Sequence, residues 1–266
     1  MSKNNSKRDI LVTNALPYAN GDLHLGHILE HIQSDIWVRY QRLQGNNCTY
    51  ICGEDAHGTS IMLKAEELGI TPEKLIKQVR VCHEQDFEAF NISHDNYHTT
   101  HSEENRHYSE TIFMNLKEEG LIEEKEIEQL YDTQKGLFLS DRYVKGTCPS
   151  CKSEDQYGDN CEVCSSAYSA VDLIDPVSVL TNSKPKLKKS LHLFFKLSDL
   201  KVEIKKWLKS AQVASQAINK LAEWTESEIK DWDISRDAPY FGFKIPEYEN
   251  KYFYVWLDAP IGYLAS

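Results

Sequence analysis

Two histidines and a glycine at the start of a predicted helix have the types and spacing of a phosphate site. His24, Gly26 and His27 follow a short apolar strand at residues 10–12 and a turn. A helix N-terminus presents free backbone N–H groups and the positive end of the helix dipole. Gly26 lets a charged ligand approach the backbone, and imidazoles three residues apart share one face of the first turn. We therefore predict that this turn binds phosphate and stabilises charge that develops during displacement at phosphorus.

Two simpler interpretations of the histidine pair stay open. His24 and His27 could merely cap the helix, or they could bind a stray metal ion. Metal binding by the pair alone is weak, because no third ligand is evident nearby. The combination with Gly26 on a strand–loop–helix, with Pro17 upstream, favours the phosphate interpretation.

Four of the seven cysteines form two C-x-x-C pairs, separated by nine residues. Two such pairs facing each other make a tetrahedral S4 site that suits zinc, with bonds of ~2.3 Å. Four thiolates leave no position open for water or substrate, so the predicted role is structural. A redox role is the main rival, but no thioredoxin-like strand–helix context accompanies these pairs. The predicted zinc ligands are Cys148, Cys151, Cys161 and Cys164.

The remaining cysteines are predicted to be unreactive. Cys48, Cys52 and Cys82 lie in apolar segments, where a thiol behaves as a small core residue.

Three segments follow predicted strands and should converge on one crevice, because ligands of doubly wound sheets bind beyond the carboxyl ends of the strands. The segments are residues 14–18, 53–59 and 256–263. Asp55 could hold an ammonium group, while Arg236 could hold a carboxylate or pair with Asp55; a charge-assisted hydrogen bond contributes ~1.5–3 kcal/mol. The alternatives are a surface ion pair of little consequence and ordinary core packing of the aromatics. The predicted apolar wall is Leu16, Tyr18, Trp256, Pro260 and Tyr263.

Strands and helices alternate in the first third of the chain. A strand at residues 48–52 precedes a helix that should end at Gly69, and Thr71 and Pro72 have the types of an N-cap and a first helical residue. This order predicts a parallel sheet with covering helices, which is a Rossmann-like half domain. Two apolar series recur at helical spacing: Leu25, Leu29, Ile32, Ile36, Tyr40 and Leu43, with Gly45 as the stop, and Leu75, Ile76, Val79, Phe87 and Phe90.

The pattern changes near Gly120. Residues 121–131 read as an antiparallel strand, and two helices are predicted at about residues 199–210 and 212–229. Residues 252–257 are apolar on both faces and are predicted to form a central strand of the first domain, with the chain ending one turn into a helix.

The predicted fold is α/β, with an incomplete Rossmann-like parallel sheet that a connective insertion interrupts. The predicted divisions are residues 8–119 for the first half of the catalytic domain, 120–230 for the insertion with its zinc knuckle at 148–164, and 231–266 for the resumed, truncated domain.

The composition is that of an ordinary soluble protein, with 41% hydrophobic and 27% charged residues among 266. No apolar run is long enough to span a membrane, and residues 1–7 lack the apolar stretch of a secretory signal, so a cytoplasmic location is expected. The net charge of −11 argues against a broad nucleic-acid-binding face. A local basic run is better explained as a solvated loop than as a nucleic-acid contact; it consists of Lys184, Lys186, Lys188 and Lys189.

These motifs resemble a known family. His24-Leu25-Gly26-His27 resembles the "HIGH" signature of class I aminoacyl-tRNA synthetases, and residues 15–27, 53–59, 232–242 and 255–263 resemble the methionyl-tRNA synthetases. The resemblance covers essentially the whole chain from Ile10 onward.

The resemblance implies a reaction in two steps. The carboxylate of L-methionine attacks the α-phosphorus of ATP, accompanied by Mg²⁺, and the resulting adenylate passes its acyl group to tRNA(Met). It further implies that Asp55 anchors the α-amino group, that Arg236 assists near the carboxylate, and that Tyr263 approaches the thioether sulfur. The implied catalytic residues are His24, His27, Asp55 and Arg236, the ATP-binding residues are Pro17, Asn20, His24, Gly26 and His27, and the methionine pocket is Ala15, Leu16, Tyr18, Trp256, Ala259, Pro260 and Tyr263.

The sequence departs from the family pattern in one respect. The lysine-rich "KMSKS" loop and the helical anticodon-binding domain are absent, so we expect a fragment with little adenylation activity. Two rival interpretations remain. One is another nucleotidylyltransferase of the same superfamily, which would lack the cysteine-bearing insertion. The other is a zinc-ribbon module that binds nucleic acid or protein without catalysis.

Overall fold

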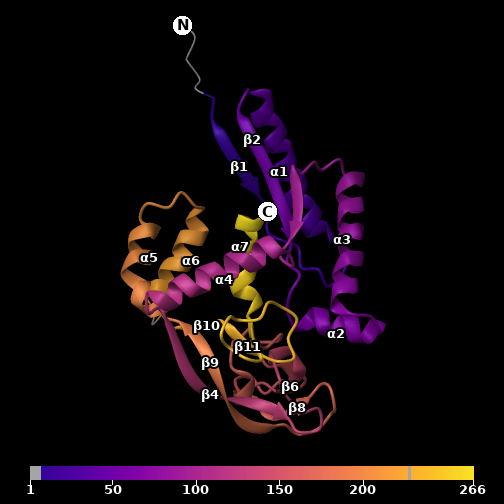
Figure 1. Ribbon diagram of the computed structural model, residues 1–266, viewed down its shortest axis with the longest axis vertical. Helices are drawn as coiled ribbons and strands as arrows, with labels where there is room; N and C mark the ends of the chain where they lie inside the picture. Colours follow the sequence, from indigo (N-terminus) through magenta and orange to yellow (C-terminus); the bar gives the residue numbers. More distant parts are fainter. Residues whose placement is uncertain (1–6, 227–228) are drawn as a thin grey trace. The chain divides into compact units, whose positions relative to one another are not determined.

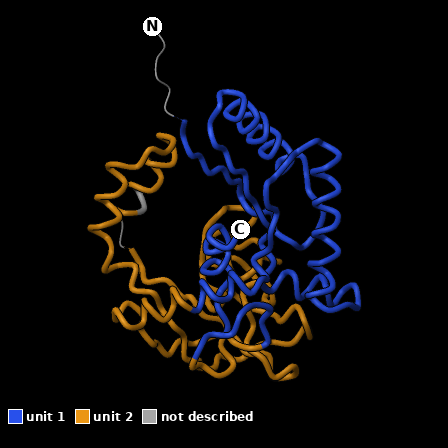
Figure 2. Tube along the Cα trace, turned by 45° about the horizontal axis from the view of Figure 1, so that its top comes forward, with its two compact units in different colours: residues 1–110, 239–246, 252–266 blue, residues 111–238, 247–251 orange. Residues whose placement is uncertain are grey.

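A computed structural model describes residues 7–226 and 229–266, which form two compact units (Figure 1 and Figure 2). The first unit comprises residues up to Glu110 with Pro239–Pro246 and Tyr252–Ser266, and the second comprises Thr111–Ala238 with Glu247–Lys251. The expected polar start at residues 1–6, and residues 227–228 of a predicted helix, lie outside the described residues. The three-part division predicted from the sequence stays a prediction.

A parallel sheet forms the centre of the first unit. It contains β1 (Asp9–Thr13), β2 (Asn47–Glu54) and β3 (Asn96–Thr99), in the order β1-β2-β3. Six of the eight residues of β2 are buried, as a strand covered on both faces requires. The predicted Rossmann-like parallel sheet is therefore confirmed.

Four helices follow these strands closely in sequence (Figure 1). At the start of α3, the hydroxyl of Thr71 accepts a hydrogen bond from the backbone N–H of Lys74 at 3.3 Å, and Pro72 is the first helical residue, as predicted. Gly69 ends α2 in the left-handed conformation with φ 65°, which only glycine adopts without strain. The helices are α1 (Leu25–Leu43), α2 (Thr59–Leu68), α3 (Pro72–Ala89) and α4 (Glu103–Glu118).

The apolar stripe that predicted α1 is not its buried face. Leu25 and Leu43 are 83% and 84% exposed, and Leu29, Ile36 and Tyr40 are exposed as well. The residues that α1 buries are instead Ile28, His31, Asp35, Val38 and Gln41. This buried face includes polar side chains because the loop before β3 supplies partners for them: the backbone N–H of Ser93 donates to Asp35 at 3.0 Å.

Two of the three lone cysteines lie in the core. Cys48 and Cys52 of β2 are buried, as predicted, whereas Cys82 is exposed and the prediction for it was wrong. Cys82 lies at the edge of the buried stripe of α3, beside the exposed Val81. An apolar neighbourhood in sequence thus does not place every thiol inward.

Residues 252–257 do not form the central strand that was predicted. Only β12 (Lys251–Phe253) is extended, and α7 (Val255–Ala265) begins two residues later and runs for 11 residues, not for one turn. The hydroxyl of Tyr240 accepts a hydrogen bond from the backbone N–H of Val255 at 3.1 Å, which fixes the first turn. A short run that is apolar on both faces suits a buried helix as well as a strand, and here the helix forms.

An antiparallel sheet dominates the second unit. β4 (Ile122–Asp132) pairs with β9 (Lys186–Phe195) over ten residues, flanked by β10 (Trp232–Asp233) and β5 (Leu137–Phe138). This confirms the strand predicted at residues 121–131. The basic run is not a loop, because β9 contains three of its four lysines.

The lysines of β9 face partners on β4. Lys189 forms an ion pair with Glu126 at 2.7 Å, and the ammonium group of Lys188 lies 4.1 Å from the centre of the Tyr131 ring. Part of the positive charge of the run is thereby matched within the sheet.

The remaining elements of the second unit are short. A three-stranded sheet carries the cysteine pairs, and β11 (Ser235–Asp237), which pairs with β12, follows β10. Within the described ranges, no helix is both long and apolar enough to cross a membrane. The strands of the small sheet are β7 (Gln156–Tyr157), β6 (Val144–Thr147) and β8 (Ile174–Ser178), the α-helices are α5 (Lys201–Leu208) and α6 (Ser215–Glu226), and the 3₁₀ turns are η1 (Asp141–Tyr143), η2 (Ala170–Asp172) and η3 (Leu197–Leu200).

Candidate active site

The histidine pair caps α1. The imidazole rings of His24 and His27 stack with their centres 3.6 Å apart. Nδ1 of His24 accepts hydrogen bonds from the backbone N–H groups of Gly26 at 3.1 Å and His27 at 3.4 Å, and Nδ1 of His27 accepts one from the backbone N–H of His24 at 3.3 Å. The pair therefore caps α1, and its binding of phosphate stays a prediction. Because both Nδ1 atoms accept, the proton of each neutral ring stands on Nε2, which is left to donate.

Gly26 is needed for this geometry. A Cβ atom at this position would lie 2.9 Å from Cε1 and 3.0 Å from Nδ1 of His24 and would displace the ring. The pKa of His27 is lowered because burial and the neighbouring His24 both disfavour a charged ring. In its neutral form the pair presents two Nε2–H donors at the mouth of α1.

Glu30 holds the turn after β1 and was missed in the sequence. Its carboxylate accepts hydrogen bonds from the side-chain amide of Asn14 at 3.0 Å and from the backbone N–H of Ala15 at 2.9 Å. Burial raises the pKa of Glu30, but these two hydrogen bonds outweigh burial and lower it. Glu30 follows His27 by three residues on the same helix, a spacing that could have drawn attention to it.

The segment after β1 extends the sheet past the ends of its strands. The backbone N–H of Ala19 donates to the carbonyl of Asp55 at 2.8 Å, and the N–H of Asp55 donates to the carbonyl of Pro17 at 2.8 Å. These bonds place Tyr18 directly beside Asp55.

Asp55 carries an unmatched buried oxygen. Among the described atoms its Oδ1 has no hydrogen-bond partner. Burial, and the nearby carboxylate of Asp258, raise the pKa of Asp55 to about 8. A buried carboxyl group of this kind is suited to receive a cation from a ligand.

Leu16 and Tyr263 meet near this carboxyl group. A Cβ on Gly262 would lie 3.2 Å from Cδ1 of Leu16. Burial raises the pKa of Tyr263, and the negative charge of Asp55 raises it further. The backbone N–H of Leu16 lies near the Tyr263 hydroxyl and partly opposes this rise. The turn after β1 and the end of α7 therefore share one neighbourhood with Asp55.

The tryptophan of α7 joins the same neighbourhood through a tyrosine. The rings of Trp256 and Tyr254 stack with their centres 5.8 Å apart. Burial raises the pKa of Tyr18, and Tyr254 is near enough to Tyr18 to raise it further. Trp256 is 62% exposed. Of the other predicted residues, Ala259 is half-buried, and Ala15, Asn20 and Pro260 are exposed.

Arg236 belongs to the second unit and not to this set. Its guanidinium donates to Asp233 at 3.2 Å and to the carbonyl of Ser235 at 2.7 Å. Its predicted role near a substrate carboxylate stays a prediction.

A second polar group was missed in the sequence. Nδ1 of His57 is hydrogen-bonded to the carboxylate of Asp258, and Nε2 of His57 lies 2.9 Å from Nδ1 of His101. Both His57 and Asp258 lie inside motifs that carry the family resemblance. Neither was predicted as a site residue, because the two side chains meet only in the folded chain. They connect α7 to the segment after β2.

The four clustered cysteines have the geometry of a zinc site. Their Sγ atoms all lie within 4.8 Å of one another, with 3.9 Å between Cys148 and Cys164 and 3.6 Å between Cys151 and Cys161. A tetrahedral ion with bonds of ~2.3 Å separates its sulfur ligands by about 3.8 Å. The cluster can therefore hold zinc without a change of the backbone.

These features define the class: a Rossmann-like α/β fold with a stacked histidine pair after the first strand and a four-cysteine cluster. The chain belongs to the family described as tRNA synthetases class I (M), whose model matches residues 10–266.

Solved structures agree with this fold. Two structures of methionyl-tRNA synthetase from Mycobacterium tuberculosis, bound by or in complex with methionyl-adenylate, each match with a TM-score of 0.72 at 21% sequence identity. The matches cover 97% of this chain and 47% and 46% of the two mycobacterial chains. The chain thus spans about half the length of these neighbours, and the likeness establishes its fold.

Proposed function

We propose that this protein activates L-methionine with ATP and transfers the methionyl group to tRNA(Met) in the cytoplasm. The observation that carries the proposal is the buried, unmatched Oδ1 of Asp55, which lies in one neighbourhood with Leu16 and Tyr263. An apolar amino acid needs such a pocket, with one anionic anchor for its ammonium group. The mycobacterial structures with methionyl-adenylate support this proposal by their fold.

In the proposed complex, the ammonium group of methionine meets Asp55 and its thioether approaches Tyr263. Leu16, Tyr18 and Trp256 contribute the apolar wall, with Ala15, Ala259 and Pro260 around it. The backbone of Leu16 lies close enough to the Tyr263 hydroxyl to lower its pKa, so the tyrosine stands beside the turn after β1. Arg236 would assist near the carboxylate.

ATP would bind at the mouth of α1. The Nε2–H groups of His24 and His27 would donate to its phosphate oxygens, with Pro17, Asn20 and Gly26 nearby, and Mg²⁺ would neutralise part of the pyrophosphate charge. A methionine carboxylate oxygen attacks the α-phosphorus, and the bond from that phosphorus to pyrophosphate breaks. These residues act by positioning and by stabilising developing charge. That the histidines face Trp256 across one crevice is part of this proposal.

The cysteine cluster would hold one structural zinc ion, which fixes the small sheet of the second unit. Since four thiolates complete the coordination shell, no step of the reaction is assigned to this ion.

Binding of amino acids tests the proposal. Isothermal titration should show that L-methionine binds more tightly than L-leucine, and Asp55→Asn should weaken methionine binding by about 10–100-fold, the value of one charge-assisted hydrogen bond. Asp22→Asn is the control, because Asp22 is an exposed carboxylate of the neighbouring loop between β1 and α1. Equal binding of leucine, or an Asp55→Asn chain with unchanged affinity, would contradict the proposal.

A further inference from the structure

A second cluster of metal-ligand side chains lies inside the first unit, apart from the four-cysteine cluster. His31 of α1, Cys52 of β2 and His94 of the loop before β3 each offer one ligand atom, and these atoms all lie within 4.8 Å of one another. His31 and Cys52 are buried and His94 is half-buried. We propose that these three residues form a transition-metal site that takes a borderline-soft divalent cation such as zinc.

The distances fit such an ion. Nδ1 of His31 lies 3.0 Å from Nε2 of His94. Zinc bonds of about 2.0–2.1 Å to nitrogen and about 2.3 Å to sulfur place tetrahedral ligand atoms about 3.3–3.7 Å apart. The two nitrogens therefore need to separate by only a few tenths of an ångström, and Sγ of Cys52 lies within 4.8 Å of both.

The ligand set is chemically consistent. Two imidazoles and one thiolate are ligands that zinc and cobalt share, and hard cations such as Mg²⁺ do not prefer them. On binding, the thiol of Cys52 releases its proton to solvent, and both imidazoles bind in their neutral form. Three protein ligands leave the fourth position for water, unlike the closed shell of the four-cysteine cluster.

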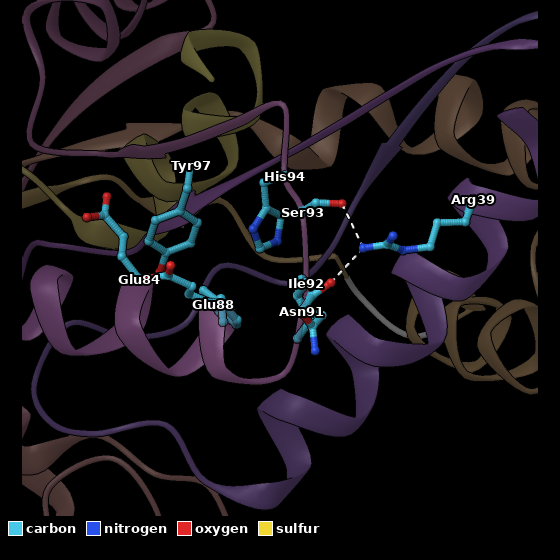
Figure 3. Close-up of a pocket in the computed structure, with 9 residues that line it drawn as sticks. Arg39, Glu84, Glu88, Asn91, Ile92, Ser93, His94 and Tyr97 are labelled. Atoms are coloured by element: carbon cyan, nitrogen blue, oxygen red, sulfur yellow. Dashed lines mark hydrogen bonds between the residues drawn. The ribbon is translucent and has the colours of Figure 1, made fainter.

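The protein holds His94 in place independently of any ion. Asp35 accepts hydrogen bonds from both the backbone N–H and the hydroxyl of Ser93 at 3.0 Å. Arg39 donates to the carbonyl of Asn91 at 2.6 Å and to the hydroxyl of Ser93 at 3.1 Å, as Figure 3 shows. A ligand whose neighbours are fixed in this way loses little conformational entropy on binding.

A pocket of about 400 Å³ reaches the cluster at His94, which lines it with Phe87 and Tyr97. Glu84, Glu88 and Arg39 line the same pocket (Figure 3). The two glutamate carboxylates outnumber the one guanidinium and favour the approach of a cation. The site thus has ligands, support and access.

The zinc content of the purified 266-residue chain tests the proposal. After equilibration with zinc and removal of loosely bound metal, we expect two zinc ions per wild-type chain and one in His94→Phe and in Cys52→Ala. Phenylalanine preserves the ring packing of His94 against Tyr50 and Phe87, whose ring centres lie at 4.5 Å and 4.9 Å. Cys48→Ala is the matched control, because Cys48 is a buried thiol of the same strand outside the cluster, and it should retain two ions.

A second measurement removes any dependence on the other site. In a Cys161→Ser background, zinc should raise the unfolding temperature of the first unit, because an ion that binds only the folded state stabilises it. Adding His94→Phe should abolish this rise, and adding Cys48→Ala should leave it. A wild-type chain with one zinc ion, or a zinc content that neither His94→Phe nor Cys52→Ala lowers, would overturn the proposal.

Discussion

The imidazole of His57 and the carboxylate of Asp258 form a hydrogen-bonded pair whose side chains are both fully buried. The pair connects the segment after β2 to α7, and these residues stand 201 positions apart in the sequence. The Phe243 ring packs edge-on against the His57 ring, with the ring centres 4.6 Å apart, so an apolar side chain covers the imidazole. Because Asp258 also lies near Asp55, one contact fixes both the position of α7 and the charge around the proposed ammonium anchor.

Removal of one partner of this pair should be costly. Asp258→Ala leaves a buried histidine without its acceptor, and we expect the free energy of unfolding to fall by about 3–5 kcal/mol. Asp258→Asn retains an acceptor for His57 and should cost less. Urea denaturation of the three chains measures both effects. An alanine variant as stable as the wild type would show that His57 and Asp258 are not energetically coupled.

The affinity for methionine should depend on pH. The pKa of Asp55 is raised to about 8 by burial and by Asp258, so at pH 6 the free site holds an uncharged carboxyl group. The ammonium of methionine requires the carboxylate, so affinity should rise by about tenfold per pH unit below pH 8 and then level off. Titration calorimetry at pH 6, 7 and 8 measures this slope.

Asp258→Asn provides a second test of this pH dependence. Asp258→Asn removes the negative charge beside Asp55, so the affinity for methionine should level off at a lower pH than in the wild type. An affinity that is constant from pH 6 to 8 in the wild type would mean that Asp55 does not bind the ammonium group.

The helices of the first unit follow from the sequence because their signals are local. The cap at Thr71, the stop at Gly69 and the spacing of buried residues in α3 all act within a few residues. The face that α1 buries was not predictable in this way. Its apolar stripe from Leu25 to Leu43 is exposed, and the polar Asp35 is buried because Arg39 and Ser93 satisfy it.

The site shows the same division between local and distant signals. The stacking of His24 and His27 lies within one helical turn, and the residue types indicate it. The pairing of His57 with Asp258 arises only when distant segments fold together, and the sequence gives no spacing for it. The helix α7 was mistaken for a strand because a short apolar run has no period that distinguishes the two structures.

A buried glutamate should make the first unit less stable at high pH. Burial raises the pKa of Glu54 to about 8, although Arg80 and Thr99 oppose the rise. In the unfolded chain the carboxyl group ionises near its ordinary pKa of 4.5, so between these two pKa values folding requires uptake of a proton. Stability from this group is therefore complete below about pH 4.5 and is lost as the pH rises towards 8.

Glu54→Gln tests this dependence. Glutamine has the same shape and no charge, so the free energy of unfolding at pH 8 should rise by roughly 1–3 kcal/mol, with a smaller gain at pH 5. Glu84→Gln is the control, since Glu84 is a more exposed carboxylate that pairs with Arg80. Urea denaturation at both pH values distinguishes them, and equal effects at pH 5 and 8 would contradict the assignment.

The zinc knuckle should stabilise one unit only. Cys161→Ser removes one of four thiolates, and we expect loss of zinc and a lower unfolding temperature for the second unit, with the first unit unchanged. Cys82→Ser is the matched control, because Cys82 is an exposed thiol outside the cluster. Hydrogen exchange resolved along the chain reports the two units separately. Unchanged protection of the small sheet in the Cys161→Ser chain would contradict a structural role for the metal.

Gly26 in the first turn of α1 and Gly21 in the loop before it offer a direct test of the histidine pair. A Cβ at Gly26 would lie 2.9 Å from Cε1 of His24, whereas a Cβ at Gly21 would meet no atom within 4 Å. Gly26→Ala should therefore displace the His24 ring from its stack on His27 and weaken ATP binding by about tenfold or more, which corresponds to the net value of one hydrogen bond to a charged group. Gly21→Ala should leave ATP binding unchanged. Equilibrium dialysis with ATP measures both variants, and equal affinities would show that the imidazole stack does not contact the phosphates.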